Sequence, residues 1–286
     1  MTEGTPIGGP TLRIVDSHVH VSTSWYEPVE TLLHHMDQLG VAQAVLVQES
    51  AQTDNTYLFE CARRYPARFS VVGNVDSAEP NAIGTVEDLV AKGASGLRLK
   101  ATVRSAGNDP YAIWRAASRL GLPISCSGLT ADYLDDEFAL CAEAAGDVPI
   151  VAEHLGAAST LEQEEVSAET RFAVQRKLAA IPNIMVKFHG FGEFSARARP
   201  AVEPFPFALP VLPLFEHAYE TFGPDRMMWG SDFPPVSRRE GYRNSLVLPL
   251  DVFRDKPEAE RATMFGDLAS SVFRIRTPAG RAVADR

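Results

Sequence analysis

The sequence predicts a single-domain α/β protein, a (β/α)8 barrel with loop insertions at its C-terminal face. Eight short apolar segments recur along the 286 residues, and segments of helical periodicity lie between them. The early apolar segments follow one another at intervals that suit one strand and one helix, and eight such units close a barrel. A chain of this length fits one barrel domain with one core.

Most of the eight segments are apolar throughout instead of alternating between apolar and polar residues. Parallel strands that are buried on both faces have this pattern, whereas a sheet with one solvent-exposed face does not. We therefore expect parallel strands over Arg13–His20, Gln43–Glu49, Phe69–Asp76, Ser95–Lys100, Pro123–Ser127, Pro149–Leu155, Ile184–His189 and Met227–Phe233.

The segments between the strands have apolar residues at helical spacing, and glycines mark several of their ends. Gly40, Gly93 and Gly121 each follow a helical segment in an apolar context, which is typical of a helix C-terminus. The expected helices are Pro28–Leu39, Asn55–Tyr65, Val86–Lys92, Pro110–Leu120, Asp132–Ala145, Glu169–Ala180 and Leu212–Thr221.

Extra length falls at Ala158–Glu169 and at Ser195–Pro210, and the second insertion contains four prolines. Long loops in compact domains are usually functional, so the second insertion is either a lid above the barrel mouth or surface decoration. We expect a flexible tail over residues 1–10, the barrel over 11–275 and a second tail over 276–286.

Composition excludes several classes of function. A net charge of −10 argues against nucleic acid and against an anionic membrane surface, because both attract basic proteins. The sequence has no apolar run long enough to span a membrane, and we expect no signal peptide. Its three cysteines, Cys61, Cys126 and Cys141, form no CxxC pair. These features favour a cytoplasmic protein that acts on a small molecule.

Two histidines at the end of the first strand are the first candidate for chemistry. In the segment Asp16-Ser17-His18-Val19-His20, strand alternation sends the rings of His18 and His20 to the same face. At the end of a barrel strand that face points into the mouth, where two imidazoles could bind a divalent metal or polarise a carbonyl. Paired histidines also occur in structural roles.

A carboxylate, Asp232, ends the last strand, where Gly230 allows close approach and Pro234 stops strand pairing. It could accept a proton from water, or alternatively cap a following helix. Two further histidines, His154 and His189, lie at strand ends. The other three lie in helical segments and are expected to be surface or packing residues, namely His34, His35 and His217.

Together, the segment ending in His18-Val19-His20, the segment Glu153-His154-Leu155-Gly156 and the segment Trp229–Pro234 resemble the amidohydrolase-related branch of the amidohydrolase superfamily. The order and spacing match over nearly the whole chain. This branch includes lactonases that act on pyrone dicarboxylate and sugar lactones, and metal-dependent decarboxylases. The resemblance implies that His18, His20 and His154 are catalytic and that Asp232 is the base of the eighth strand.

One departure from the family pattern concerns the metal. Metal-dependent members have a histidine ligand at the end of the fifth strand, where this chain reads Ser125-Cys126-Ser127. We expect either no cofactor or one weakly bound divalent metal, most readily zinc, held by His18, His20 and Asp232. Cys126 could replace the missing ligand or act as a nucleophile, but its apolar neighbours favour a packing role.

Several basic residues are candidates for binding an anionic substrate. Arg98, Lys100, Lys187 and His189 lie at strand ends, where a charge is costly unless it is paired or used. They would bind a carboxylate or a lactone carbonyl, or instead pair with Glu49, Asp76 or Glu153. Guanidinium groups suit carboxylates well, so the loop after Asp232 adds three candidates, Arg238, Arg239 and Arg243.

The expected function is hydrolysis of a small, carboxylated lactone by water that Asp232 activates, with the carbonyl polarised by histidines. One alternative is a metal-dependent decarboxylase or amide hydrolase of the same superfamily. Another is an inactive barrel that binds an anionic metabolite or a partner protein. A homodimer is a further expectation.

Overall fold

The computed structural model describes residues 12–157, 166–198, 200, 207 and 211–275. Eight strands form one sheet in sequence order, and each strand is parallel to the next. The strands are β1 (Ile14–Val19), β2 (Val41–Val47), β3 (Phe69–Asn74), β4 (Gly96–Lys100), β5 (Ile124–Ser127), β6 (Ile150–Ala152), β7 (Ile184–Phe188) and β8 (Met227–Trp229).

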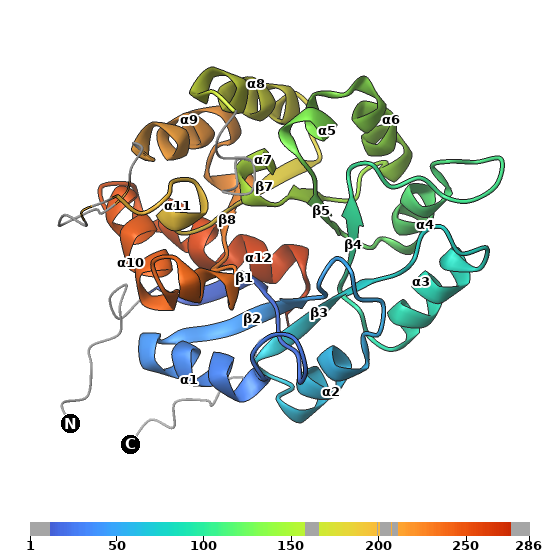
Figure 1. The fold of residues 1–286 in the computed structure, drawn as a ribbon, viewed down its shortest axis with the longest axis horizontal. Coiled ribbons are helices and arrows are strands. Elements are labelled where there is room, and N and C mark those ends of the chain that lie inside the picture. The colour runs from blue at the N-terminus through green and yellow to red at the C-terminus, as the bar shows by residue number, and fades with distance from the viewer. Residues whose placement is uncertain (1–11, 158–165, 199, 201–206, 208–210, 276–286) are drawn as a thin grey trace.

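The sheet curves until its first and last strands meet. The segment just after β8 closes it, because Val19 forms a parallel bridge with Phe233 and the His20 N–H donates to the Phe233 carbonyl at 2.7 Å. Helices surround the strands (Figure 1), so the predicted (β/α)8 barrel is confirmed.

The helices mostly follow the predicted ranges. Those that precede β8 are α1 (Val29–Leu39), α2 (Thr56–Arg64), α3 (Ala82–Ala91), α4 (Ala112–Leu120), α5 (Thr130–Leu134), α6 (Asp136–Ala145), the single turn α7 (His154–Ala157), α8 (Ala168–Ala179) and α9 (Leu212–Phe222). Three more follow β8, namely α10 (Tyr242–Val252), α11 (Glu258–Ala262) and α12 (Leu268–Val272), and a π-helical turn (Thr263–Asp267) joins the last two.

Several elements differ from the sequence prediction. Helix α3 begins at Ala82 and not at Val86, β8 ends at Trp229 and not at Phe233, and α10, α11 and α12 were not predicted. The predicted helix Asp132–Ala145 is two helices, because Asp135 is extended between them and its carboxylate caps the Glu137 N–H of α6. The predicted strand Pro149–Leu155 is shorter, because His154 and Leu155 adopt left-handed backbone angles directly after β6.

Helix α1 illustrates why these segments fold as they do. It buries Val29, Leu32, Met36 and Leu39, whose spacing places them on one face of the helix, against the sheet. The helix ends at Gly40, which has a φ of 71°. Glycine adopts this left-handed conformation without the steric penalty of a side chain, so the prediction that glycine ends this helix is confirmed.

The end of the barrel opposite the catalytic candidates is plugged. Inward-facing valines from the strands cluster with the last described helix, α12, and with Phe273 and Ile275. Phe273 lies near the start of β4, since a Cβ added at Gly96 would lie 3.3 Å from its ring. Access to the barrel interior is therefore from the carboxyl ends of the strands, where barrel enzymes place their sites.

Part of each predicted insertion lies outside the described residues, which also exclude both predicted tails. The predicted lid and the predicted flexible tails therefore concern residues outside the described part of the chain. Among the helices that the structure does describe, none has the length and apolar character needed to cross a membrane.

Candidate active site

His18 in β1 and His20, directly after this strand, share a face, as strand alternation predicts. His18 and His20 are buried with ring centroids 4.8 Å apart. His20 Nδ1 lies 2.7 Å from the Val47 carbonyl, which can only accept, so Nδ1 carries the hydrogen and Nε2 presents its lone pair. Burial lowers the pKa of His20 to about 3, so the ring is neutral.

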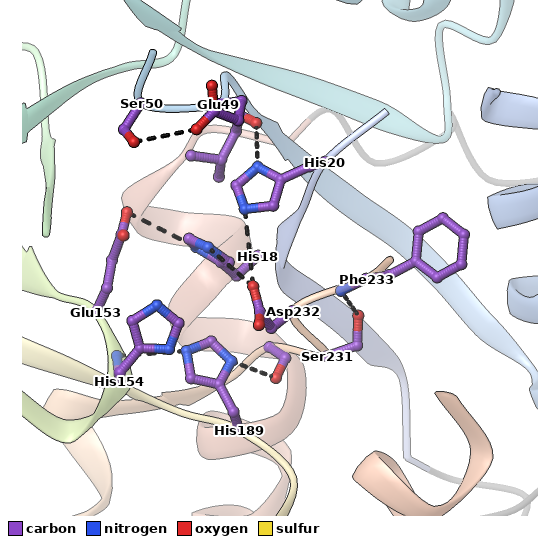
Figure 2. A network of polar contacts seen from close by, with 12 residues as sticks. His18, His20, Glu49, Ser50, Glu153, His154, His189, Ser231, Asp232 and Phe233 are labelled. Carbon is purple, nitrogen blue, oxygen red and sulfur yellow. Dashed lines mark hydrogen bonds and ion pairs between the residues drawn. The ribbon is translucent and has the colours of Figure 1, made fainter. Parts of the chain in front are cut away.

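Asp232 faces both of these histidines. Its backbone has a φ of 57°, and its N–H donates to the His18 carbonyl at 3.0 Å, which ties the residue after β8 to β1. Figure 2 shows the carboxylate pointing at the two rings. The Oδ1 atom lies 3.7 Å from Nε2 of His18 and 3.7 Å from Nε2 of His20.

A guanidinium holds the other oxygen of the same carboxylate. Arg239 donates to Oδ2 of Asp232 at 2.8 Å and also forms an ion pair with the buried Glu193. Burial raises the pKa of Asp232 to about 7, against the opposing effect of nearby positive charge. A general base works best when its pKa lies near the working pH, and Asp232 meets this condition.

Gly230 makes the close approach of β8 to β1 possible. An added Cβ would lie 2.7 Å from the Cβ of His18 and 3.0 Å from its backbone nitrogen, and neither atom can move without shifting β1. We expect Gly230→Ala to lower the free energy of unfolding by about 1–3 kcal/mol, the usual cost of overpacking. Urea unfolding of both proteins tests this, and an unchanged free energy would contradict the close contact.

His154 and His189 complete the ring of imidazoles (Figure 2). Their ring centroids lie 4.5 Å apart, and that of His154 is 5.7 Å from that of His18. Nδ1 of His154 lies 3.2 Å from a carboxylate oxygen of Glu193, and Nδ1 of His189 donates to the Gly230 carbonyl at 2.8 Å. The left-handed turn at His154 aims its side chain into the site.

Arg98 is committed to an internal ion pair. Its Nε and one terminal nitrogen donate to the two oxygens of Glu153 at 3.2 and 2.7 Å, and the Ser125 hydroxyl donates to the same carboxylate at 2.7 Å. Burial opposes the charge of Glu153, but Arg98 and Lys187 outweigh it and lower the pKa of Glu153 to about 2. Of the two roles weighed for Arg98, the geometry favours pairing with Glu153.

The other basic candidates have three different environments. Lys187 is fully buried, and its Nζ lies 3.0 Å from His18 Nδ1. Lys100 is exposed and, with Arg98, lines a cavity of about 290 Å³ at the carboxyl ends of the neighbouring strands. Arg238 and Arg243 are exposed on the loop and helix that follow Asp232.

The helical histidines have the surface and packing environments expected of them. His34 is exposed, the His35 ring stacks on Tyr242 with centroids 5.4 Å apart, and the His217 ring stacks on Phe172 at 4.4 Å. Cys126 is buried in the apolar core, where burial raises the pKa of its thiol. A protonated thiol in this environment suits packing.

Sequence reasoning missed several residues of this site. Asp16 accepts hydrogen bonds from the backbone of His18 and Ser231 at 3.2 and 2.8 Å, and its position two residues before His18 on the same strand face was an available signal. Glu193 follows β7 in a short 3-10 helix, Phe191–Glu193, and no local pattern marks it. Only the folded chain brings it to Arg239.

His18, His20 and Asp232 form a group with the donor types that suit zinc, and their candidate ligand atoms lie within 4.8 Å of one another. Nε2 of His18 is buried without a hydrogen-bond partner and faces this group. The described residues therefore fit a metal at this position. Two other groups share His154, one with His18 and Glu153 and one with Glu193 and Asp232.

Known proteins with similar sequences identify the family of this chain. A sequence model of a family described as amidohydrolase matches residues 10–275. The 4-sulfomuconolactone hydrolase of Rhizobium radiobacter is 25% identical over 249 residues, which are 85% of this chain and 77% of that protein.

Two solved structures have the same fold. One is an amidohydrolase from Burkholderia multivorans with bound zinc (TM-score 0.72, 19% identity, 92% of this chain and 100% of that chain). The other comes from Acinetobacter baumannii, is assigned as a 2-pyrone-4,6-dicarboxylic acid hydrolase and has citric acid bound (TM-score 0.68, 19% identity, 92% and 100%).

Proposed function

Because the chain belongs to the amidohydrolase family, we propose that it hydrolyses a small lactone that carries an anionic group. The position of Asp232 carries this proposal. Its Oδ1 faces Nε2 of His18 and Nε2 of His20 at equal distances of 3.7 Å, while Arg239 holds its Oδ2. One carboxylate oxygen is therefore fixed, and the other is left to face a water molecule among the imidazoles.

In the proposed reaction Asp232 takes a proton from water, and the water oxygen forms a bond to the lactone carbonyl carbon. Negative charge then develops on the carbonyl oxygen, where an imidazole N–H in a buried site stabilises it strongly. The ring C–O bond breaks, and the proton held by Asp232 passes to the leaving oxygen. The product is a hydroxy acid, and Asp232 returns to its starting state.

A metal at this site would be held by His18, His20 and Asp232, and when bound it would polarise the carbonyl or lower the pKa of water. Those three residues, with His154, surround the space where the carbonyl would lie. Arg239 orients Asp232 toward this space through its hydrogen bond to Oδ2.

The lactone and its anionic group draw support from relatives. The curated relative is named for the hydrolysis of a sulfonated muconolactone, and the fold is shared with a structure that contains citric acid. Among the basic candidates that the structure describes, the exposed Lys100, Arg238 and Arg243 are left for a substrate anion, because Arg98 and Arg239 already pair with buried carboxylates.

A lactone panel tests the proposal. Acid release would be followed by pH-stat for muconolactones, pyrone carboxylates and sugar lactones, each beside an uncharged analogue of the same ring. We expect hydrolysis of at least one anionic lactone and a lower kcat/KM for its uncharged analogue. Failure to open any lactone, together with decarboxylation or amide hydrolysis of other family substrates, would contradict the proposal.

The same panel repeated after chelation tests the metal. Since the fifth strand offers no histidine, we expect activity to fall less than tenfold on prolonged dialysis against a chelator. Complete loss of activity that added zinc restores would show a required metal. Metal analysis of the dialysed protein is the control, because it shows that chelation was effective.

A further inference from the structure

We propose that Lys187 is a positioning residue that fixes the tautomer of His18. In this arrangement His18 presents an N–H at Nε2 to the active site, whereas His20 presents a lone pair at its own Nε2. The two histidines of the HxH pair would thus differ in function although they point to the same place.

The contacts of Lys187 identify it as a donor. Its Nζ, fully buried, lies 2.7 Å from the Ser125 hydroxyl, 3.0 Å from His18 Nδ1 and 5.3 Å from the centroid of the Phe273 ring. The position over an aromatic face is typical of a charged ammonium, which has three hydrogens and no lone pair. Ser125 gives its own hydrogen to Glu153, so its oxygen accepts from Lys187.

A second hydrogen of the ammonium is then available for His18. Nδ1 of His18 must accept it, and a ring nitrogen that accepts carries no hydrogen, so the hydrogen of the ring lies on Nε2. The nearest competing partner for Nδ1 is a Glu153 oxygen at 3.8 Å. That oxygen is beyond hydrogen-bonding distance and already accepts from Arg98 and Ser125.

Two neighbouring histidines have the opposite arrangement. Nδ1 of His20 and Nδ1 of His189 hydrogen-bond to the backbone carbonyls of Val47 and Gly230. A carbonyl only accepts, so both of these rings carry their hydrogen on Nδ1. Nδ1 of His154 lies 3.2 Å from a Glu193 carboxylate oxygen without forming a hydrogen bond to it. Among the four imidazoles of the described site, His18 is the one that a donor holds at Nδ1.

The tautomer has two consequences. Under the proposed lactone hydrolysis, on which this role depends, His18 donates from Nε2 to the carbonyl oxygen as negative charge develops there. For a metal, a ring with a hydrogen on Nε2 offers no lone pair at that atom. Zinc binding by His18, His20 and Asp232 would then require His18 to change its tautomer, and weak binding would follow.

Nitrogen NMR of the metal-free wild-type protein tests the tautomer directly. With 15N-labelled histidine, the signals of His18 are identified by their loss in His18→Gln, and those of His20 serve as an internal reference. We expect a protonated Nε2 in His18 and a protonated Nδ1 in His20. A protonated Nδ1 in His18 would overturn the proposal, and this measurement needs neither a substrate nor a Lys187 variant.

Variants of Lys187 test whether this residue fixes the tautomer of His18. In Lys187→Met the donor is absent, and Glu153 becomes the nearest polar partner of His18 Nδ1. A histidine that donates from Nδ1 to a carboxylate is the usual arrangement in zinc sites. We expect zinc affinity, measured by competition with a coloured chelator, to rise at least about tenfold, the scale of such outer contacts. Lys187→Arg, which keeps a donor, should bind zinc as weakly as the wild type.

Circular dichroism and thermal melting show whether each Lys187 variant folds. If neither variant folds, the nitrogen NMR spectrum of the wild-type protein still decides the tautomer of His18. Unchanged or weaker zinc binding by a folded Lys187→Met protein would overturn the assigned role of Lys187. Failure of the lactone panel would remove the proposed function, but it would leave the NMR and zinc results to decide the tautomer.

Discussion

Replacing Asp232 with asparagine is expected to lower kcat for lactone hydrolysis by about a thousandfold, within the usual range for loss of a positioned general base. An amide cannot take the proton of the attacking water. Its oxygen can still face the two imidazoles, and Arg239 remains paired with Glu193. The KM should therefore change much less than kcat, and steady-state kinetics on the best lactone of the panel would separate the two.

The matched control is Asp255→Asn, which makes the same chemical change where the side chain is 91% exposed. We expect the control to keep the kcat of the wild type. If Asp232→Asn hydrolysed the lactone at the wild-type rate, the base would have to be another residue. The imidazoles of His18, His20 and His154 would then act together with a different general base.

Replacing Arg98 with methionine is expected to lower the free energy of unfolding by about 3 kcal/mol, the lower end of the range for breaking a buried ion pair. The change leaves Glu153 buried without its bidentate partner. The Ser125 hydroxyl still donates to it, and Lys187 lies one hydrogen bond further away. Because these contacts remain, we expect a loss at the lower end of the range. Equilibrium urea unfolding of both proteins measures the difference in the free energy of unfolding.

Two controls separate this effect from the loss of a charge as such. Arg119→Met removes an ion pair with Glu87 in which both side chains are about half exposed, and it should cost less than about 1 kcal/mol. In the double variant Arg98→Met with Glu153→Gln, the unpaired buried charge is absent. Its unfolding free energy should lie above that of Arg98→Met, and a value below it would contradict the ion-pair explanation.

Most of the fold could be predicted because its signals are local. Continuous apolar segments predict parallel strands, and helical spacing with glycine after Leu39, Lys92 and Leu120 predicts the helices between them. The boundaries at Asp135 and His154 could not be predicted. They depend on a capping side chain and on left-handed backbone angles that the surrounding structure holds in place.

The candidate site, like the fold, has one part that could be predicted from the sequence and one part that could not. His18, His20, His154, His189 and Asp232 stand at strand ends in the sequence, and parallel strands in a barrel must bring such ends together. The partners of the charged groups were not predictable. Arg98 could have faced substrate or Glu153, and no local pattern connects Arg239 with Glu193 or Lys187 with His18.

Local patterns in the sequence were enough to predict the barrel, the end at which the candidate catalytic side chains gather and the identity of most of them, because periodicity and strand direction are properties of neighbouring residues. Which charge pairs with which, which oxygen of Asp232 is held by Arg239 and which nitrogen of His18 or His20 carries the hydrogen could be read only from the folded chain. Hydrogen bonds act over about 3 Å, and only folding brings residues as distant as His18 and Lys187 within that range.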